Sequence, residues 1–273
     1  MKELQKRSLS GFVFVLTLLG AVYFGPYTFA VLFLLLAIFM LREFYSLGIH
    51  GGFAPQVYPG IAIGIFIFTF SFLIATGVST AKSFLALFPI LFSVPIYELF
   101  RKKQRSLGNI ALTLFGLIYV IVPFSLLNFL VYPSFPESNI YDPSLLFILF
   151  IIIWTCDSGA YLFGVRFGKH RLFERISPKK SWEGFLGGLA VAILASFILS
   201  LIIKEYSFLF LAVFALVTVI AGTLGDLVES MIKREVGIKD SGKFMPGHGG
   251  LLDRFDSILI SVPFIYFVVQ FFR

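Results

Sequence analysis

The residues best suited to catalysis lie between Ser230 and Asp256, where carboxylates, bases, glycines and one histidine interrupt an otherwise apolar chain. Asp253 and Asp256 stand three apart at the start of the last apolar run, so they share one face if that run is helical. Ionisable groups in an apolar helix usually mark a site. Four more polar residues at helical spacing share a face just upstream: Asp226, Glu229, Ser230 and Lys233.

Two carboxylate-bearing helix ends suit a hard cation such as Mg²⁺, which takes oxygen ligands and is shared with substrate phosphates. The competing interpretation is a charge-paired helix bundle, in which Asp226 or Asp253 neutralises Lys233 or Arg254. The sequence alone leaves both interpretations open.

Glycines surround the one histidine of this segment. Gly249 and Gly250 follow His248, and such glycines let the backbone approach a ligand and expose N–H groups, as phosphate loops do. His248 could be a base, a donor to phosphate or a loop-fixing hydrogen bonder, and we favour the latter two. Lys239 and Asp240 lie in the same stretch and are further candidates.

A second polar stretch lies upstream, at residues 157–161 and 177–184. The Ser-Pro pair that opens the second range is typical of a helix start. Lys179, Lys180 and Ser181 are therefore predicted in the first turn of a helix, where free backbone N–H groups favour an anion such as phosphate. The alternative is an amphipathic helix start whose lysines only reach toward the membrane surface.

Three glycines follow directly, and their spacing has a structural explanation. Gly184, Gly187 and Gly188 fall on one helix face and predict close packing against a neighbouring helix. His50 and His170 lie in basic loop contexts without partner residues, so no role is predicted for either.

Composition sets the class of protein. With 58% hydrophobic residues and 36 Phe, the chain cannot stay monomeric in water, and its apolar runs exceed the roughly 20 residues that cross a bilayer. We therefore predict an all-α integral membrane protein. The single Cys156 excludes an intramolecular disulfide and a cysteine-based metal site. The basic and then apolar N-terminus predicts an uncleaved signal anchor.

Nine transmembrane helices are predicted where apolar runs are closed by charges, Pro or Gly. The 34 residues from Ser8 to Leu41 carry no charge and are too long for one crossing, so we divide them at Gly25-Pro26. Five spans fall in an N-terminal region, 1–142, and four in a C-terminal region, 143–273. The predicted spans are about 9–24, 26–41, 57–77, 83–100, 107–132, 143–165, 184–203, 207–229 and 255–272.

Charge placement predicts the orientation. With this division, all Lys and Arg except Lys82, Lys204 and Arg273 fall on the side of the N-terminus, which the positive-inside rule makes cytoplasmic. The C-terminus is then on the opposite side. The basic cluster at 101–105 needs no more than this orientation signal, together with attraction to anionic lipids.

The order Ser230-x-Ile-Lys-Arg, Lys239-Asp-x-Gly and Pro246-x-His-Gly-Gly-Leu-x-Asp-Arg-Phe-Asp256 resembles the signature of the phosphatidate cytidylyltransferases, or CDP-diacylglycerol synthases. The likeness extends upstream to about residue 150, whereas the N-terminal half resembles the family only in hydropathy. Met245 departs from the pattern, since Leu, Ile or Phe is expected there, but the change is between apolar side chains.

The resemblance implies an Mg²⁺-dependent nucleotidyltransferase of phospholipid biosynthesis, which converts CTP and phosphatidic acid to CDP-diacylglycerol and pyrophosphate. A second metal or a monovalent cation remains open. The expected location is the cell inner (plasma) membrane, with the active site facing the cytoplasm. The expected partners are membrane lipids and a second copy of the chain, and no nucleic acid is expected to bind.

The resemblance also assigns roles to the candidate residues. Asp226, Asp253, Lys233, Arg254, Lys239 and His248 are implied to be catalytic. The implied metal ligands are Asp226, Asp253, Asp256 and Glu229. Substrate binding is implied for Asp157, Ser177, Lys179, Lys180, Ser181, Glu183, Ser230, Arg234, Asp240, Gly249 and Gly250.

Other classes compete with this one. An ion-coupled membrane transporter also places acids on helix faces, but the polar residues here gather at one membrane face and no inverted repeat is apparent. A CDP-alcohol phosphotransferase would show a different spacing of Asp residues. A polyprenol kinase that uses CTP is harder to exclude from residue types.

Overall fold

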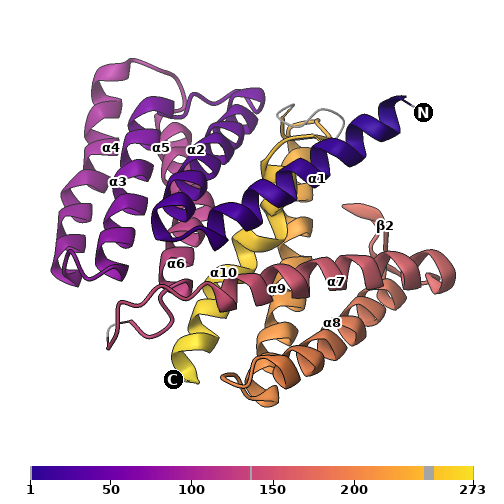
Figure 1. The fold of residues 1–273 in the computed structure, drawn as a ribbon. Helices are drawn as coiled ribbons and strands as arrows, with labels where there is room; N and C mark the ends of the chain where they lie inside the picture. The colour runs from indigo at the N-terminus through magenta and orange to yellow at the C-terminus, as the bar shows by residue number, and fades with distance from the viewer. Residues whose placement is uncertain (1, 136, 243–248, 273) are drawn as a thin grey trace. The chain divides into compact units, whose positions relative to one another are not determined.

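The computed structural model is almost entirely helical (Figure 1). It describes residues 2–135, 137–242 and 249–272, with side chains described from residue 10 on. The elements are α1 Lys2–Tyr23, α2 Pro26–His50, α3 Val57–Ala75, the 3₁₀ helix η1 Ala81–Ala86, α4 Leu87–Arg101, α5 Ser106–Gly116, the π-helical turn η2 Leu117–Ile121, α6 Val122–Leu130, α7 Ser144–Phe167, β1 Arg171–Phe173, β2 Ser177–Ser181, α8 Trp182–Ile202, α9 Phe208–Glu235 and α10 Leu252–Phe271.

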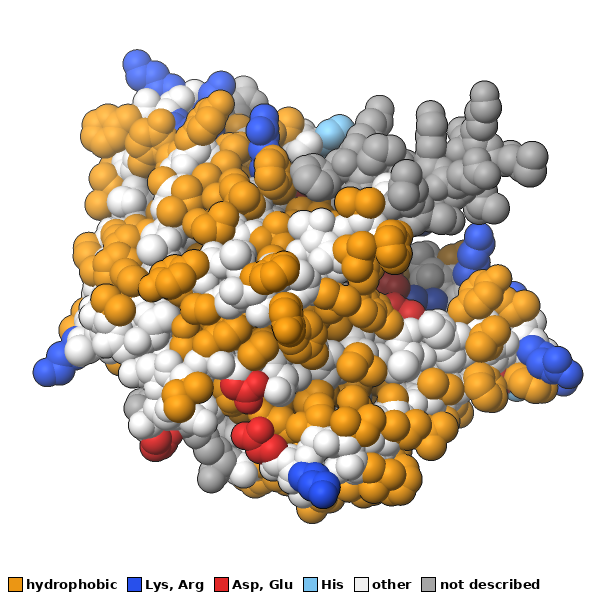
Figure 2. Space-filling view, in the orientation of Figure 1, with side chains coloured by type: hydrophobic (Ala, Val, Ile, Leu, Met, Phe, Trp, Pro, Cys, Tyr) orange, Lys and Arg blue, Asp and Glu red, His pale blue; other side chains and the backbone are white. Residues whose placement is uncertain are grey.

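Seven helical stretches in the described residues are long and apolar enough to cross a membrane, and a shorter apolar stretch covers Ser10–Tyr23. The visible surface carries mostly hydrophobic side chains and few charged ones (Figure 2). Apolar side chains face outward in this way when lipid rather than water surrounds the protein. The chain is an all-α integral membrane protein, as predicted.

The chain forms two compact units. The first contains the residues up to 143 together with 235–255, and the second contains 144–234 and 256–273. The polar segment that follows α9 therefore belongs with the N-terminal helices, although it stands late in the sequence.

The break predicted at Gly25-Pro26 is confirmed. Gly25 precedes α2 with a φ of 123°, which an L-residue rarely adopts, and Pro26 occupies the first turn, where its missing N–H has no helical partner to lose. The second helix is longer than predicted. It continues past residue 41 to His50, because Phe44, Tyr45 and other apolar residues of the extension are buried.

A buried polar cluster in the first unit surrounds Glu98, whose side chain is only 2% exposed. Its carboxylate accepts hydrogen bonds from Gln56 Nε2 at 2.7 Å, Asn109 Nδ2 at 2.8 Å and Arg101 Nη1 at 2.9 Å. Arg101 also donates to the carbonyl of Ala54 at 2.7 Å. Arg101, one base of the 101–105 cluster, thus binds groups inside the protein in addition to any role in membrane orientation.

Glycines let the helices of the second unit pack closely. A Cβ atom on Gly184 would stand 2.9 Å from the carbonyl oxygen of Ala160, and one on Gly188 would stand 2.8 Å from that of Cys156. Helices α7 and α8 therefore lie side by side, as Figure 1 shows, and the predicted glycine face is confirmed. Gly225 plays the same part between α9 and α10, where a Cβ would stand 2.5 Å from the carbonyl oxygen of Asp256.

Candidate functional site

A two-stranded hairpin precedes α8, and here the prediction of a helical first turn was wrong. Lys179 and Lys180 lie on β2, which pairs antiparallel with β1 through Arg171 and Ser181. The helix begins only at Trp182, because the Ser181 hydroxyl accepts the N–H of Gly184 at 3.2 Å and so caps α8. The prolyl residue in β2 is tolerated since a two-stranded sheet has only edge strands.

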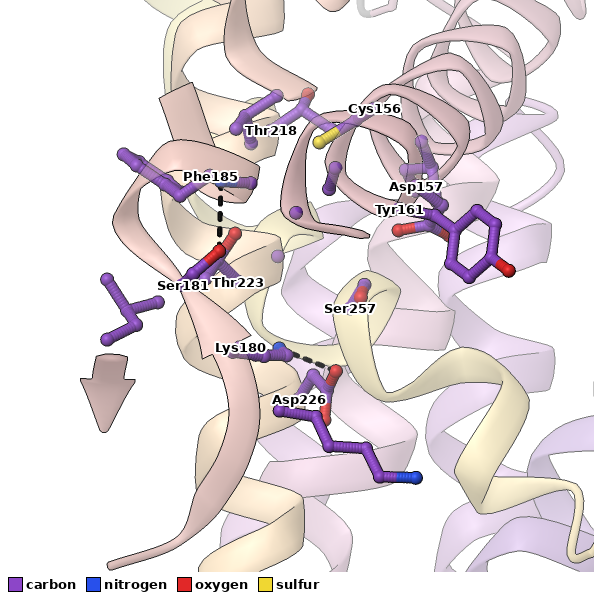
Figure 3. A pocket seen from close by; sticks show the side chains of 18 residues that line it. Cys156, Asp157, Tyr161, Lys180, Ser181, Phe185, Thr218, Thr223, Asp226 and Ser257 are labelled. Atoms are coloured by element: carbon purple, nitrogen blue, oxygen red, sulfur yellow. Dashed lines mark hydrogen bonds and ion pairs between the residues drawn. The ribbon is translucent and has the colours of Figure 1, made fainter. Parts of the chain in front are cut away.

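This hairpin and four helices of the second unit enclose a pocket of about 240 Å³ (Figure 3). Its apolar side is formed mainly by Ile153, Phe185 and Val219, and its polar side by acids, lysines and hydroxyls. The polar residues that line it are Asp157 and Tyr161 from α7, Lys179, Lys180 and Ser181 from β2, Thr218, Thr223 and Asp226 from α9, and Ser257 from α10.

The shortest polar contact in the pocket is an ion pair. Lys180 Nζ lies 2.6 Å from Asp226 Oδ2, and the two side chains are 28% and 33% exposed (Figure 3). Asp226 also accepts a hydrogen bond from Ser230 Oγ at 3.2 Å. Two predicted site residues that stand far apart in the sequence are therefore in contact, on a surface that an anionic ligand can reach.

One turn further along α9, Lys233 Nζ lies 2.5 Å from Glu229 Oε2, and both side chains are buried. The charge-paired interpretation thus applies to Lys233, but its partner is Glu229 rather than Asp226.

Glu183 at the start of α8 holds the hairpin. Its carboxylate accepts the backbone N–H groups of Lys169 and His170, and His170 Nδ1 lies 2.6 Å from Glu183 Oε1. The expectation that His170 lacks a partner was therefore wrong. Ser177 opens β2 opposite Phe173. The stretch from Ser177 to Glu183 thus shapes the wall that presents the two lysines.

In the first unit, Asp253 organises the segment that precedes α10. Asp253 Oδ2 accepts the N–H groups of Gly250 at 2.8 Å and of Ser241 at 3.0 Å. Gly249 makes room for this carboxylate, since a Cβ there would stand 2.8 Å from Asp253 Oδ2. Among the other predicted residues, Lys239 and Asp240 of this segment are exposed, and so are Arg234 near the end of α9 and Arg254 in α10. His248 lies outside the described residues.

Some residues at the site were not predicted. Tyr161, Thr218, Thr223 and Ser257 line the pocket with hydroxyl groups. Thr223 stands three residues before Asp226 and Ser257 directly follows Asp256, so their closeness to predicted acids was a usable signal.

The acids of the second unit fit a cation that is shared with a substrate. Among the described residues, no group of three or more His, Cys, Asp or Glu could hold a metal by itself. Asp226 and Asp256 nevertheless stand on adjacent helices that meet at Gly225, where the backbone of Asp256 comes closest. Mg²⁺ is typically held by one or two carboxylates, with waters and substrate phosphates in the remaining positions.

An all-α membrane protein whose pocket combines lysines, carboxylates and hydroxyls with apolar residues is suited to binding a phosphorylated substrate beside a lipid. The chain belongs to the cytidylyltransferase family, whose model matches residues 5–272. Membership makes the protein a nucleotidyltransferase and implies a divalent metal ion.

Curated relatives agree with this family. The phosphatidate cytidylyltransferase of Bacillus subtilis is 32% identical over 278 residues, which cover all of both chains. That of Staphylococcus haemolyticus is 31% identical over 261 residues, 95% of this chain and 96% of the relative. That of Haemophilus influenzae is 44% identical over 132 residues, 46% of each chain.

Proposed function

We propose that this chain is a phosphatidate cytidylyltransferase. The observation that carries the proposal is the match to the Bacillus subtilis enzyme over the whole length of both chains. The pocket of the second unit is compatible with it, because lysines, hydroxyls and a carboxylate line one side and apolar residues the other.

In the proposed reaction, a phosphate oxygen of phosphatidic acid attacks the α-phosphorus of CTP. The bond between the α-phosphorus and its bridging oxygen breaks, and pyrophosphate leaves. The attacking phosphate monoester is already anionic near neutral pH, so a strong general base is not required. The protein must instead neutralise charge and align the two phosphates.

Different residues are proposed to bind the phosphates and to attract the nucleotide. Lys179 and Lys180 bind phosphate oxygens at the pocket, and Asp226 holds Lys180 in place for this contact. The hydroxyls of Thr223 and Ser257 are placed to donate to the same anion. Arg234, Lys239 and Arg254 are exposed bases that attract the polyanionic nucleotide.

Mg²⁺ is the proposed metal, held by Asp226 with Asp256 in the second unit. The family motif also implies Asp253 as a metal ligand. When bound, such an ion neutralises phosphate charge and favours departure of pyrophosphate. Glu229 is a weaker candidate ligand, because its ion pair with Lys233 is buried, whereas the ion pair of Asp226 with Lys180 is partly exposed.

The direct test is turnover in detergent. Purified protein supplied with Mg²⁺, phosphatidic acid and labelled CTP should form CDP-diacylglycerol and pyrophosphate in equal amounts. EDTA should stop the reaction and excess Mg²⁺ should restore it. Transport of a labelled ion without release of pyrophosphate would favour the transporter alternative, and phosphorylation of a polyprenol would favour the kinase.

We further propose that the active site faces the cytoplasm and that the protein spans the inner membrane. In a variant with Cys156 replaced by Ser, Lys103→Cys and His170→Cys should be protected from an impermeant thiol reagent in intact cells. Ser138→Cys should be labelled. Labelling of position 170 but not of 138 would reverse the proposed orientation. The predicted homodimer can be tested by the mass of the detergent-solubilised particle.

A further inference from the structure

Glu43 lies in the N-terminal half of the chain but binds residues about 200 positions later. Its Oε1 accepts the N–H of Leu251 at 3.0 Å, and its Oε2 accepts the N–H of Leu252 at 2.8 Å. The hydroxyl of Ser241 donates to Oε2 at 3.2 Å. All of these residues belong to the first unit. Glu43 therefore caps the start of α10, where backbone N–H groups have no helical partner and favour a negative charge.

Two glycines of the polar segment make room for this carboxylate. A Cβ atom on Gly242 would collide with Glu43 Oε1, and one on Gly250 would stand 2.7 Å from Glu43 Oε2 while colliding with Ser241 Oγ. Gly250 was predicted to serve the approach of a ligand, whereas no such role was predicted for Gly242. In the structure their small size serves the approach of Glu43.

The same backbone also binds Asp253. Ser241 donates its hydroxyl to Glu43 and its N–H to Asp253, while Gly250 donates its N–H to Asp253 and the next residue donates to Glu43. The carboxylates of Glu43 and Asp253 thus share Ser241 as a donor and bind the neighbouring N–H groups of Leu251 and Gly250. If Glu43 is lost, two backbone N–H groups and one hydroxyl of the segment that fixes the Asp253 carboxylate lose their acceptor.

We propose that Glu43 is a positioning residue for nucleotidyl transfer, which acts by fixing the segment that carries Asp253. This inference rests on the proposed function, because Asp253 matters for turnover only if the family motif applies. It gives the N-terminal helices a part in the reaction beyond membrane anchoring.

Glu98 offers a matched control. It is also a glutamate of the N-terminal helices, and its carboxylate also accepts three hydrogen bonds, in this case all from side chains, those of Gln56, Asn109 and Arg101. None of these partners belongs to the segment 235–255. A general loss of packing would follow from changes at either glutamate, whereas a positional effect on Asp253 should follow only from changes at Glu43.

The test compares E43A, E43Q, E43D and E98Q in detergent with the full chain. Misplacing a reactive group by about 1 Å costs on the order of 100-fold. We therefore expect kcat of E43A to fall ~100-fold, with KM for CTP and for phosphatidic acid within about twofold of the original values. E43Q keeps the size and should lose ~10-fold, while E43D should restore part of the loss seen in E43A.

A second readout does not depend on activity. Amide hydrogen exchange of a peptide covering 249–255 should become at least ~10-fold faster in E43A, because Leu251 and Leu252 lose their acceptor. E98Q should lower the unfolding temperature but leave kcat within about twofold and this exchange unchanged.

Each outcome decides between named alternatives. Retention of kcat by E43A within about twofold, or equal exchange effects in the Glu43 and Glu98 variants, would overturn the inference. If E43A does not fold, the same comparison with E43Q decides. If the unmodified protein forms no CDP-diacylglycerol, the proposed function fails, while the exchange experiment still tests the hold of Glu43 on the segment.

Discussion

Asp226→Asn should abolish turnover while the protein remains folded. We expect kcat to fall at least ~1,000-fold, which corresponds to ~4 kcal/mol in activation free energy. Asn has nearly the shape of Asp, so the Ser230 hydroxyl keeps an acceptor. The variant loses the negative charge that holds Lys180 Nζ at 2.6 Å and that is proposed to bind Mg²⁺. Lys180 is partly exposed and can be hydrated instead, so the cost in stability should be small.

The measurement is formation of CDP-diacylglycerol from labelled CTP, with the unfolding temperature in detergent as the check on folding. Glu205→Gln is the matched control, because it also replaces an acid by its amide but lies on an exposed loop between α8 and α9. It should keep full activity. Activity of Asp226→Asn within about tenfold of the original value would rule out Asp226 as a metal ligand and as the partner that positions Lys180.

Local sequence signals determine much of the membrane architecture. Long apolar runs require helices in a bilayer, and the residues that interrupt them act locally. The Gly25-Pro26 break is an example, because Pro removes a donor and Gly accepts a positive φ whatever surrounds them. The glycine face of α8 is another, since only residues of that size permit close helix packing.

The hairpin before α8 could not be predicted in the same way. Ser177-Pro178 is compatible with a helix start and also with an edge strand, and the choice depends on pairing with Arg171–Phe173. That pairing is not a local property of the sequence. The Ser181 cap was the better local signal, because its hydroxyl can satisfy an N–H only if the helix begins after it.

Polar contacts at long range were the hardest to predict. Glu43 stands beside Arg42 at the end of a predicted apolar span, where an acid is easily taken for a helix boundary. Its partners Leu251 and Leu252 offer only backbone groups, which no residue pattern reveals. The pair of His170 and Glu183 was missed for a related reason, since the hairpin that brings them together was not predicted.

Asp253→Asn separates the charge of Asp253 from its structural role. The N–H groups of Ser241 and Gly250 both bind Oδ2, at 3.0 and 2.8 Å, so an Asn with its oxygen in that place keeps both hydrogen bonds. It loses only the longer contact of the Ser241 N–H with Oδ1, at 3.3 Å. We expect kcat to fall at least ~1,000-fold, or ~4 kcal/mol, because the carboxylate charge is lost. Amide exchange of residues 249–255 should stay close to that of the unmodified protein.

The informative comparison is with E43A, which has the opposite effect. E43A keeps the Asp253 charge but releases its backbone, so it should accelerate exchange and reduce kcat less. If Asp253→Asn accelerates exchange as much as E43A does, the loss of turnover in Asp253→Asn is explained by loss of order in the segment. The charge of Asp253 then has no separate role. If exchange is unchanged and turnover persists, Asp253 does not act in catalysis. Glu43 then has no catalytic residue to position, and its proposed role is refuted as well.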